Sequence, residues 1–235
     1  MSGFVMQILV NHLTRMQPGW ICFAGIELIS RRQIRPVQDR PLTRKLLASE
    51  GGPLALGHVI ELGPSEFCGR VPEIEDRKFH SDQIQLIRQV SFQELHDACA
   101  EISASRLRDI FGNELLWINH HPNQPGTAAV DEHAGIRSLG CYWATQGRLQ
   151  LITSGDRSKV RFEFMEDNLQ FSIPVTDIRL FLADHQTPNE VALQQMNSAL
   201  QNQEKTLVAL GLSRAYRISD SQPARHWLQL NNLIA

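Results

Sequence analysis

The 235-residue chain has only four cysteines, and no two of them form a C-x-x-C pair. They stand far apart, at Cys22, Cys68, Cys99 and Cys141, each among apolar neighbours. Zinc ribbons and thioredoxin-type redox sites need paired cysteines, and small disulfide-stapled domains need a dense set of them. The sequence therefore excludes these classes and predicts buried, reduced thiols that pack like small hydrophobic residues.

Long apolar runs are missing as well. Nowhere does the chain carry about 18 consecutive apolar residues, the length that a membrane-spanning helix needs. The apolar stretch Met1–Val10 is short and contains no basic residue, so it predicts a first strand rather than a signal peptide. We therefore expect a cytoplasmic protein that makes no contact with a membrane.

The residue patterns of common enzymes are also missing. The chain has no G-x-S-x-G nucleophile elbow, and Gly51-Gly52 is not followed by the residues of a phosphate-binding loop. None of the cysteines has a sequence context that would lower its pKa toward that of a reactive thiolate. The sequence thus gives no reason to expect a hydrolase, a transferase or a redox enzyme.

Histidine is the residue type that most invites a metal site. His120-His121 and Asp131-Glu132-His133 lie in or beside one loop and are of types that bind zinc. Adjacent histidines do not face one site, and neither H-E-x-x-H nor H-x-H occurs, so we expect solvated side chains with no metal and no cofactor. A nucleotide-processing activity whose residues the sequence does not identify stays open, and the His120–His133 loop would be its place.

Charge is the first positive signal. The net charge is −2, yet residues 14–48 carry seven Lys or Arg against two Asp or Glu. Arginine suits phosphate because its planar fork donates two parallel hydrogen bonds. The alternative is an ordinary solvated edge whose cations discourage strand pairing. The residues predicted to contact nucleic acid are Arg31, Arg32, Arg35, Arg44 and Lys45.

Strand patterns dominate the rest of the chain. Between residues 160 and 173, apolar and polar side chains alternate on both sides of Glu166-Asp167-Asn168, which predicts a hairpin with one buried face. Gln146-Gly147 predicts a second tight turn, between strands over Leu139–Thr145 and Arg148–Ile152. Helices between most strands, as a doubly wound α/β fold requires, are missing.

Two helices stand out. The S-x-x-E capping box that begins at Ser91 opens a helix near 91–104, and a second box at Thr187-Pro188-Asn189-Glu190 opens one near 188–203. The sequence therefore predicts a mostly β protein with minor α, made of two small curled sheets or barrels with one inserted helix each. The expected units are residues 1–115 and 136–235, joined by a connecting loop over 116–135.

Short motifs in both halves carry a family resemblance. They are Met6–Val10, the Cys22–Ile26 strand with Gly25, Ile34-Arg35-Pro36-Val37, Ser138-Leu139-Gly140, Arg161–Phe164, Val175-Thr176-Asp177 and His226–Leu230. In this order and spacing the chain resembles the dual OB domain-containing family of prokaryotic proteins. The resemblance implies two consecutive OB-like barrels, with Gly25, Pro36, Thr176 and Asp177 at family motif positions.

The family is understood as nucleic-acid recognition in bacterial conflict and mobile-element systems, including antiviral defence. Together with the basic window, this implies a non-catalytic module that binds single-stranded or structured DNA or RNA. The alternative is a protein-interaction or scaffold subunit of a larger nucleoprotein complex. The more acidic second half and the glutamine-rich stretch Gln194–Gln203 favour that second hypothesis.

Overall fold

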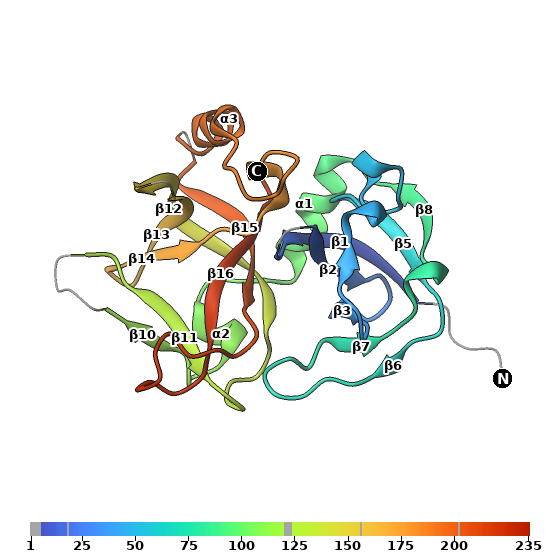
Figure 1. Ribbon diagram of the computed structural model, residues 1–235, viewed down its shortest axis with the longest axis horizontal. Helices are drawn as coiled ribbons and strands as arrows, with labels where there is room; N and C mark the ends of the chain where they lie inside the picture. Colours follow the sequence, from blue (N-terminus) through green and yellow to red (C-terminus); the bar gives the residue numbers. More distant parts are fainter. Residues whose placement is uncertain (1–5, 18, 120–123, 156, 202) are drawn as a thin grey trace.

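A computed structural model describes residues 6–17, 19–119, 124–155, 157–201 and 203–235. The chain folds into two curled, mostly antiparallel sheets that lie side by side, with helix α1 (Phe92–Glu101) between them (Figure 1). The mostly β class expected from the strand patterns is confirmed. None of the helices in the described segments is long and apolar enough to cross a membrane.

The N-terminal unit has the strand order β6-β7-β3-β2-β1-β5-β8, and β4 pairs with β2 outside this path. The strands are β1 (Met6–Arg15), β2 (Trp20–Glu27), β3 (Gln33–Val37), β4 (Leu42–Thr43), β5 (His58–Leu62), β6 (Glu66–Phe67), β7 (Asp76–Lys78) and β8 (Gln85–Gln89). β1 and β2 form its central hairpin, and β3 pairs with β7 in parallel. Apolar side chains that include Ile8, Phe23 and Ile60 form the core of this unit.

The C-terminal unit has the order β10-β11-β16-β15-β12-β13-β14, and β9 pairs with β12. The strands are β9 (Ser103–Ala104), β10 (Leu116–Ile118), β11 (Thr127–Asp131), β12 (Leu139–Ser154), β13 (Arg157–Glu166), β14 (Leu169–Pro174), β15 (Lys205–Leu212) and β16 (Arg225–Leu233). Its helices are α2 (Leu107–Phe111) and α3 (Glu190–Leu200). Aromatic rings pack in its core. The Phe164 ring stacks on the Phe171 ring, with 4.9 Å between their centroids, and meets the Tyr142 ring edge-on.

The hairpin predicted at Glu166-Asp167-Asn168 is confirmed. Glu166 pairs with Leu169, so Asp167 and Asn168 form a two-residue loop between β13 and β14. Both loop residues have positive φ, 48° and 64°. A type I′ turn requires this backbone, and Asp and Asn tolerate it better than most other residues.

The second predicted hairpin, at Gln146-Gly147, is wrong. β12 runs without a break through these residues, and its register with β13 shifts between Thr145 and Arg148. The extra residues form a β-bulge, in which Gln146 takes a left-handed φ of 54°. The bulge bends one long strand so that its first half pairs with β15 and its second half pairs with β13.

Helix α1 begins where the sequence indicates. The backbone N–H of Glu94 donates to the Ser91 hydroxyl at 3.1 Å, and the Ser91 N–H donates to the Glu94 carboxylate at 3.2 Å. Helix α3 differs from expectation, because its cap is Asn189, whose side-chain oxygen accepts from Ala192 N at 3.2 Å. Thr187 is not free to cap the helix, since its hydroxyl donates to the Asp184 carboxylate at 2.6 Å.

The boundary between the units lies earlier than expected. The segment 116–135, expected as a connecting loop, contributes β10 and β11 to the second sheet, and β9 joins that sheet before them. β11 buries Ala128 and Ala129, and such small side chains give too weak an alternation to indicate a strand. Helix α1 is therefore the connector, and the second unit starts near Ser103.

A third apolar core joins the two units. Leu9 of β1 and Cys99 of α1 pack there with Cys141 and Leu207 of the second sheet. The expectation of buried thiols is confirmed for Cys99 and Cys141. Cys22 is partly buried, and Cys68 is exposed because it follows β6, the edge strand of its sheet.

The Val175-Thr176-Asp177 motif also lies at the contact between the two units. Arg15 N donates to Thr176 O at 2.9 Å, and Thr176 N donates to Leu230 O at 2.8 Å, so the motif connects β1 with β16. The neighbouring carboxylate of Asp177 is completely buried. It accepts from Arg179 Nη2 at 2.7 Å and from Leu233 N at 3.1 Å. Asp177 therefore also caps the turn Ile178–Leu180.

Asp177→Ala should destabilise the protein by about 3–5 kcal/mol, because it leaves a buried Leu233 N–H without its acceptor and the Arg179 guanidinium without the carboxylate that pairs with its charge. Urea unfolding followed by circular dichroism measures the change. Asp39→Ala removes an exposed carboxylate that pairs with Lys78, and its unfolding midpoint should stay close to that of wild type. Equal midpoints for the two variants would contradict the structural role of Asp177.

Candidate functional site

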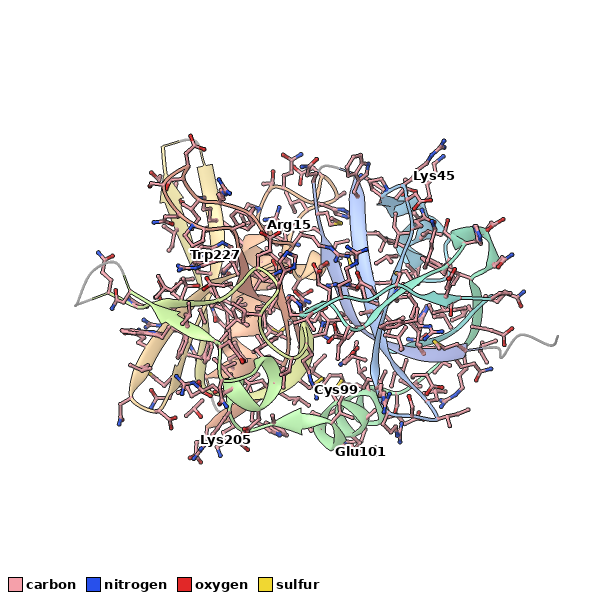
Figure 2. The ribbon with its side chains drawn as sticks, turned by 90° about the horizontal axis from the view of Figure 1, so that it is seen from below. Arg15, Lys45, Cys99, Glu101, Lys205 and Trp227 are labelled. Atoms are coloured by element: carbon pink, nitrogen blue, oxygen red, sulfur yellow. The ribbon has the colours of Figure 1, made fainter. Side chains whose placement is uncertain are left out.

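The five basic residues predicted to contact nucleic acid do not form one patch. Arg31 lies in the turn after β2, and its Nη2 is 3.0 Å from the carboxylate of Glu101 at the end of α1. Arg32 follows it and is exposed. Lys45 and Glu101, both labelled in Figure 2, lie on opposite sides of the molecule in that view. Arg31 and Arg32 are thus separated from Lys45.

Arg44 and Lys45 lie in a short helical turn, Arg44–Leu46, of the N-terminal unit. Arg44 Nη2 pairs with Glu50 at 2.6 Å, and Arg44 Nη1 donates to Ala183 O of the C-terminal unit at 2.8 Å. Lys45 is exposed. Arg44 therefore makes a contact between the two units, whereas Lys45 points into solvent.

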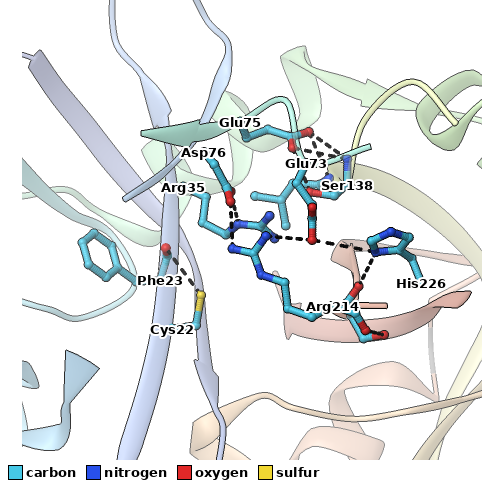
Figure 3. A network of polar contacts seen from close by, with 11 residues as sticks. Cys22, Phe23, Arg35, Glu73, Glu75, Asp76, Ser138, Arg214 and His226 are labelled. Carbon is cyan, nitrogen blue, oxygen red and sulfur yellow. Dashed lines mark hydrogen bonds and ion pairs between the residues drawn. The ribbon is translucent and has the colours of Figure 1, made fainter. Parts of the chain in front are cut away.

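Of the five predicted residues, Arg35 is the least accessible to a nucleic acid, because it is only 6% exposed. Its Nε donates to Asp76 Oδ1 at 2.5 Å. Asp76 Oδ2 accepts from Arg214 Nη2 at 2.7 Å, and Arg214 Nη1 is 2.7 Å from the Glu73 carboxylate (Figure 3). Two arginines thus balance two carboxylates, and Asp76 receives one arginine from each unit.

Glu75, which lies between Glu73 and Asp76 in the sequence, also contacts the C-terminal unit (Figure 3). Its carboxylate accepts from Ser138 Oγ at 2.8 Å, Ser138 N at 3.0 Å and Leu139 N at 3.2 Å. Burial raises the pKa of Glu75 despite these hydrogen bonds. Ser138, which the sequence presents as part of a family motif, is therefore the anchor for a carboxylate from the N-terminal unit.

A cleft of about 690 Å³ opens beside this network, between β1–β3 of the first unit and β16 with the segment 212–216 of the second. Its charged lining side chains are Arg15, Arg35, Arg40, Arg214 and Asp39. Arg15, labelled in Figure 2, lies where the two units meet, with its guanidinium 3.7 Å from the centre of the Phe181 ring. Tyr216, half exposed, adds an aromatic face. Since Arg35 and Arg214 are paired with Asp76 and Glu73, the lining arginines that make no ion pair with a described residue are Arg15 and Arg40.

His12 lies in the same cleft and is 1% exposed. Its Nδ1 lies 3.0 Å from the side-chain nitrogen of Asn231 on β16. Burial and the nearby Arg35 charge lower the pKa of His12 to about 3. The imidazole is therefore uncharged at neutral pH.

The residues expected at family motif positions lie on or next to this cleft. Pro36 and Thr176 line it, and Asp177 lies directly behind Thr176. Gly25 pairs with Val10 on the neighbouring strand, where a Cβ atom would come within 2.6 Å of Leu9 O. Glycine is therefore required for the close approach of β1 and β2, the strands that form one wall of the cleft.

No sequence pattern singled out several of the lining residues, among them His12, Arg15, Arg40 and Arg214. Arg15 and Arg40 belong to the basic window, but no local pattern separated them from Arg31 or Lys45. His12 follows the apolar run of the first strand and could have been found as a polar residue on a buried strand. Arg214 lies in the second unit, and its role depends on a contact that only the fold creates.

The expected metal-free loop is only partly described. His120 and His121 lie outside the described residues. His133 is exposed in a turn, with φ 68°. Among the described residues, no group of three or more His, Cys, Asp or Glu side chains is arranged to hold a metal ion.

Comparison with known proteins gives one strong match. The model of a family described as a dual OB-containing domain matches residues 6–233. No curated protein matches the chain. A solved structure titled "Crystal structure of the tetrameric p202 HIN2" is similar over 97% of this chain and 88% of that chain, at 8% sequence identity and a TM-score of 0.33. That likeness is too weak to support an argument about fold or ligand.

Acidification from about pH 7.5 to about pH 5.0 should destabilise the protein by about 2 kcal/mol through His12 alone. The unfolded chain protonates this imidazole below its ordinary pKa of 6.5, whereas the folded protein does so only near pH 3. Stability is therefore lost as the pH falls through this window. On the same acidification, the free energy of unfolding of His12→Gln, measured by urea unfolding, should fall by about 2 kcal/mol less than that of wild type.

The control is His80→Gln, which removes an exposed imidazole and should show the same loss on acidification as wild type. An identical loss in wild type and His12→Gln would show that His12 does not stay uncharged in the folded state.

Proposed function

Since the chain belongs to the dual OB-containing domain family, as its short motifs indicated, we propose that it binds single-stranded nucleic acid in the cleft between its two units, without catalysis. OB folds generally bind oligonucleotides on one face of a small curled sheet. The observation that supports this site is its lining, in which four arginines stand against one aspartate and two of them, Arg15 and Arg40, make no ion pair with a described residue.

The cleft suits unpaired bases better than a duplex. Its volume of about 690 Å³ is that of an ordinary small-ligand site, which would take one or a few nucleotides. The exposed ring of Tyr216 offers a stacking face of the kind that single-strand binding proteins use. Arg40 is exposed, and it makes no ion pair with any other described residue, so its charge is available to a phosphate.

The basic residues outside the cleft are competing candidates for contact with nucleic acid. Arg31 and Arg44 are each paired with a glutamate, whereas Arg32 and Lys45 are exposed. An exposed pair such as Arg31–Glu101 is weak and does not prevent a phosphate contact. The proposal that these residues bind nucleic acid therefore stays a prediction, and the experiment below separates it from binding in the cleft.

A short oligonucleotide of about 15 nucleotides should bind the wild-type protein at low salt, and the affinity should fall with rising salt. Arg40→Ala should weaken binding several-fold and reduce the slope of log K against log salt by about 0.7, the value for one phosphate contact on a single strand. Fluorescence anisotropy titrations at several salt concentrations measure both quantities.

Arg32→Ala is the matched control, because it removes another exposed arginine, which lies outside the cleft lining. Wild-type affinity for Arg32→Ala together with weakened Arg40→Ala supports the cleft. Weakened binding by Arg32→Ala with wild-type affinity for Arg40→Ala would place binding near Arg32, and weakened binding by Lys45→Ala would place it near Lys45. No binding by wild type at low salt contradicts the proposed function.

A protein-interaction subunit of a nucleoprotein complex, in a prokaryotic defence or mobile-element system, is the second candidate. Edge strand β8 supports it: all five of its residues are exposed, including Leu86 and Ile87, and Phe92 is exposed beside it. An edge strand can receive a strand of a partner. Size-exclusion chromatography with neighbouring gene products tests this role, and a complex that Ile87→Lys abolishes would support it; absence of any complex would contradict it.

A further inference from the structure

Among the described residues that line the cleft, three buried side-chain donors lack an acceptor, and one of them is Arg15 Nε. Within the described residues, neither His12 Nε2 nor Arg35 Nη2 has a hydrogen-bond partner. His12 is 1% exposed and Arg35 is 6% exposed, so both side chains are more than nine-tenths buried. A buried polar atom left without a partner costs about 1–3 kcal/mol, which makes a ligand at this point favourable.

The surroundings of His12 decide which ring nitrogen carries its proton. The Asn231 side-chain nitrogen lies 3.0 Å from His12 Nδ1, and an amide nitrogen can only donate. Nδ1 is therefore the acceptor of the ring. Because the imidazole is uncharged at neutral pH, its one proton is on Nε2, and Nε2–H is a donor.

Arg35 adds donors but little net charge. Its Nε is occupied by Asp76, and the pair is joined to Arg214 and Glu73, so two positive groups face two negative ones. A phosphate placed beside Asp76 would gain little from this balanced network. A neutral acceptor suits it better, because such a group needs hydrogen-bond donors without needing a net positive field.

We propose that His12 Nε2–H and Arg35 Nη2–H recognise the acceptor edge of a nucleobase, with guanine preferred. Guanine carries N7 and O6 as neighbouring acceptors, whereas adenine places its N6 amino donor beside N7. The unpaired base would enter the cleft while Arg15 and Arg40 remain near its phosphates. This inference rests on the proposed function and adds the chemistry of the base to it.

The test uses oligothymidylates of about 12 nucleotides that differ at one central position: thymine, guanine, adenine, hypoxanthine or 7-deazaguanine. Wild type should bind the guanine oligonucleotide about tenfold more tightly than the thymine one. Hypoxanthine keeps N7 and O6 and should match guanine, whereas 7-deazaguanine lacks the N7 acceptor and should lose most of the preference. These comparisons use only the wild-type protein.

His12→Phe supplies the protein side of the test. It removes the Nε2 donor while keeping a ring in the buried position, so the guanine preference should fall to within about twofold of thymine. The readout is the ratio of the guanine to the thymine affinity, because thymine O4 can also accept from this donor, and circular dichroism shows whether the variant folds. Equal affinity of wild type for all five oligonucleotides would overturn the inference and leave the proposed function intact.

Free nucleotides distinguish a base in a strand from a separate small ligand. Guanosine monophosphate, but not adenosine monophosphate, should compete with the guanine oligonucleotide for wild type. Calorimetric binding of guanosine monophosphate without binding of any oligonucleotide would keep the base pocket and contradict the proposed function. Failure of wild type to bind any oligonucleotide or guanosine monophosphate would contradict both.

Discussion

The Asp76 carboxylate, held between Arg35 and Arg214, is the interaction on which the arrangement of the two units depends. Arg35 belongs to β3 of the first unit, and Arg214 follows β15 of the second, so one buried carboxylate joins both. Removing one partner from a buried ion pair leaves an uncompensated charge, at a cost of about 3–5 kcal/mol. The two units are therefore expected to keep a fixed relative position as long as this network is intact.

The cleft is a consequence of that constraint. On one side of the cleft, Glu75 and Asp76 of the N-terminal unit contact Ser138 and Arg214 of the C-terminal unit. On another side, Thr176 connects β1 with β16. The space left between these two lines of contact is the cleft, with its wall on β1–β3. The interface itself thus builds the candidate site, and neither unit would contain it alone.

The distribution of charge within the cleft separates two tasks. Arg40, exposed and without a carboxylate partner in the described part of the chain, suits the backbone of a nucleic acid. Arg35, neutralised by Asp76 and buried, suits a neutral acceptor. Phosphate contacts contribute affinity and base contacts contribute specificity, so a site with both kinds of arginine could do both.

Much of the fold could be predicted from sequence, because local patterns fix it. The alternation around Asp167-Asn168 and the capping box at Ser91 each depend on a few adjacent residues, and the structure has both. The turn predicted at Gln146-Gly147 fails for the opposite reason: a glycine after a left-handed residue serves a hairpin and a bulge equally well. The choice between them is made by β13 and β15, which pair with the two halves of β12.

The candidate site could be predicted only in part. The sequence by itself determined the mostly β class, the two-unit plan and a basic first half that includes Arg35. Only the tertiary structure decided that Arg35 is buried against Asp76, that Arg31 and Arg44 lie apart, and that His12 meets Asn231, more than 200 residues away. Strand patterns arise from neighbouring residues, whereas burial and ion pairing arise from contacts between distant segments, and these are set only when the two sheets pack together.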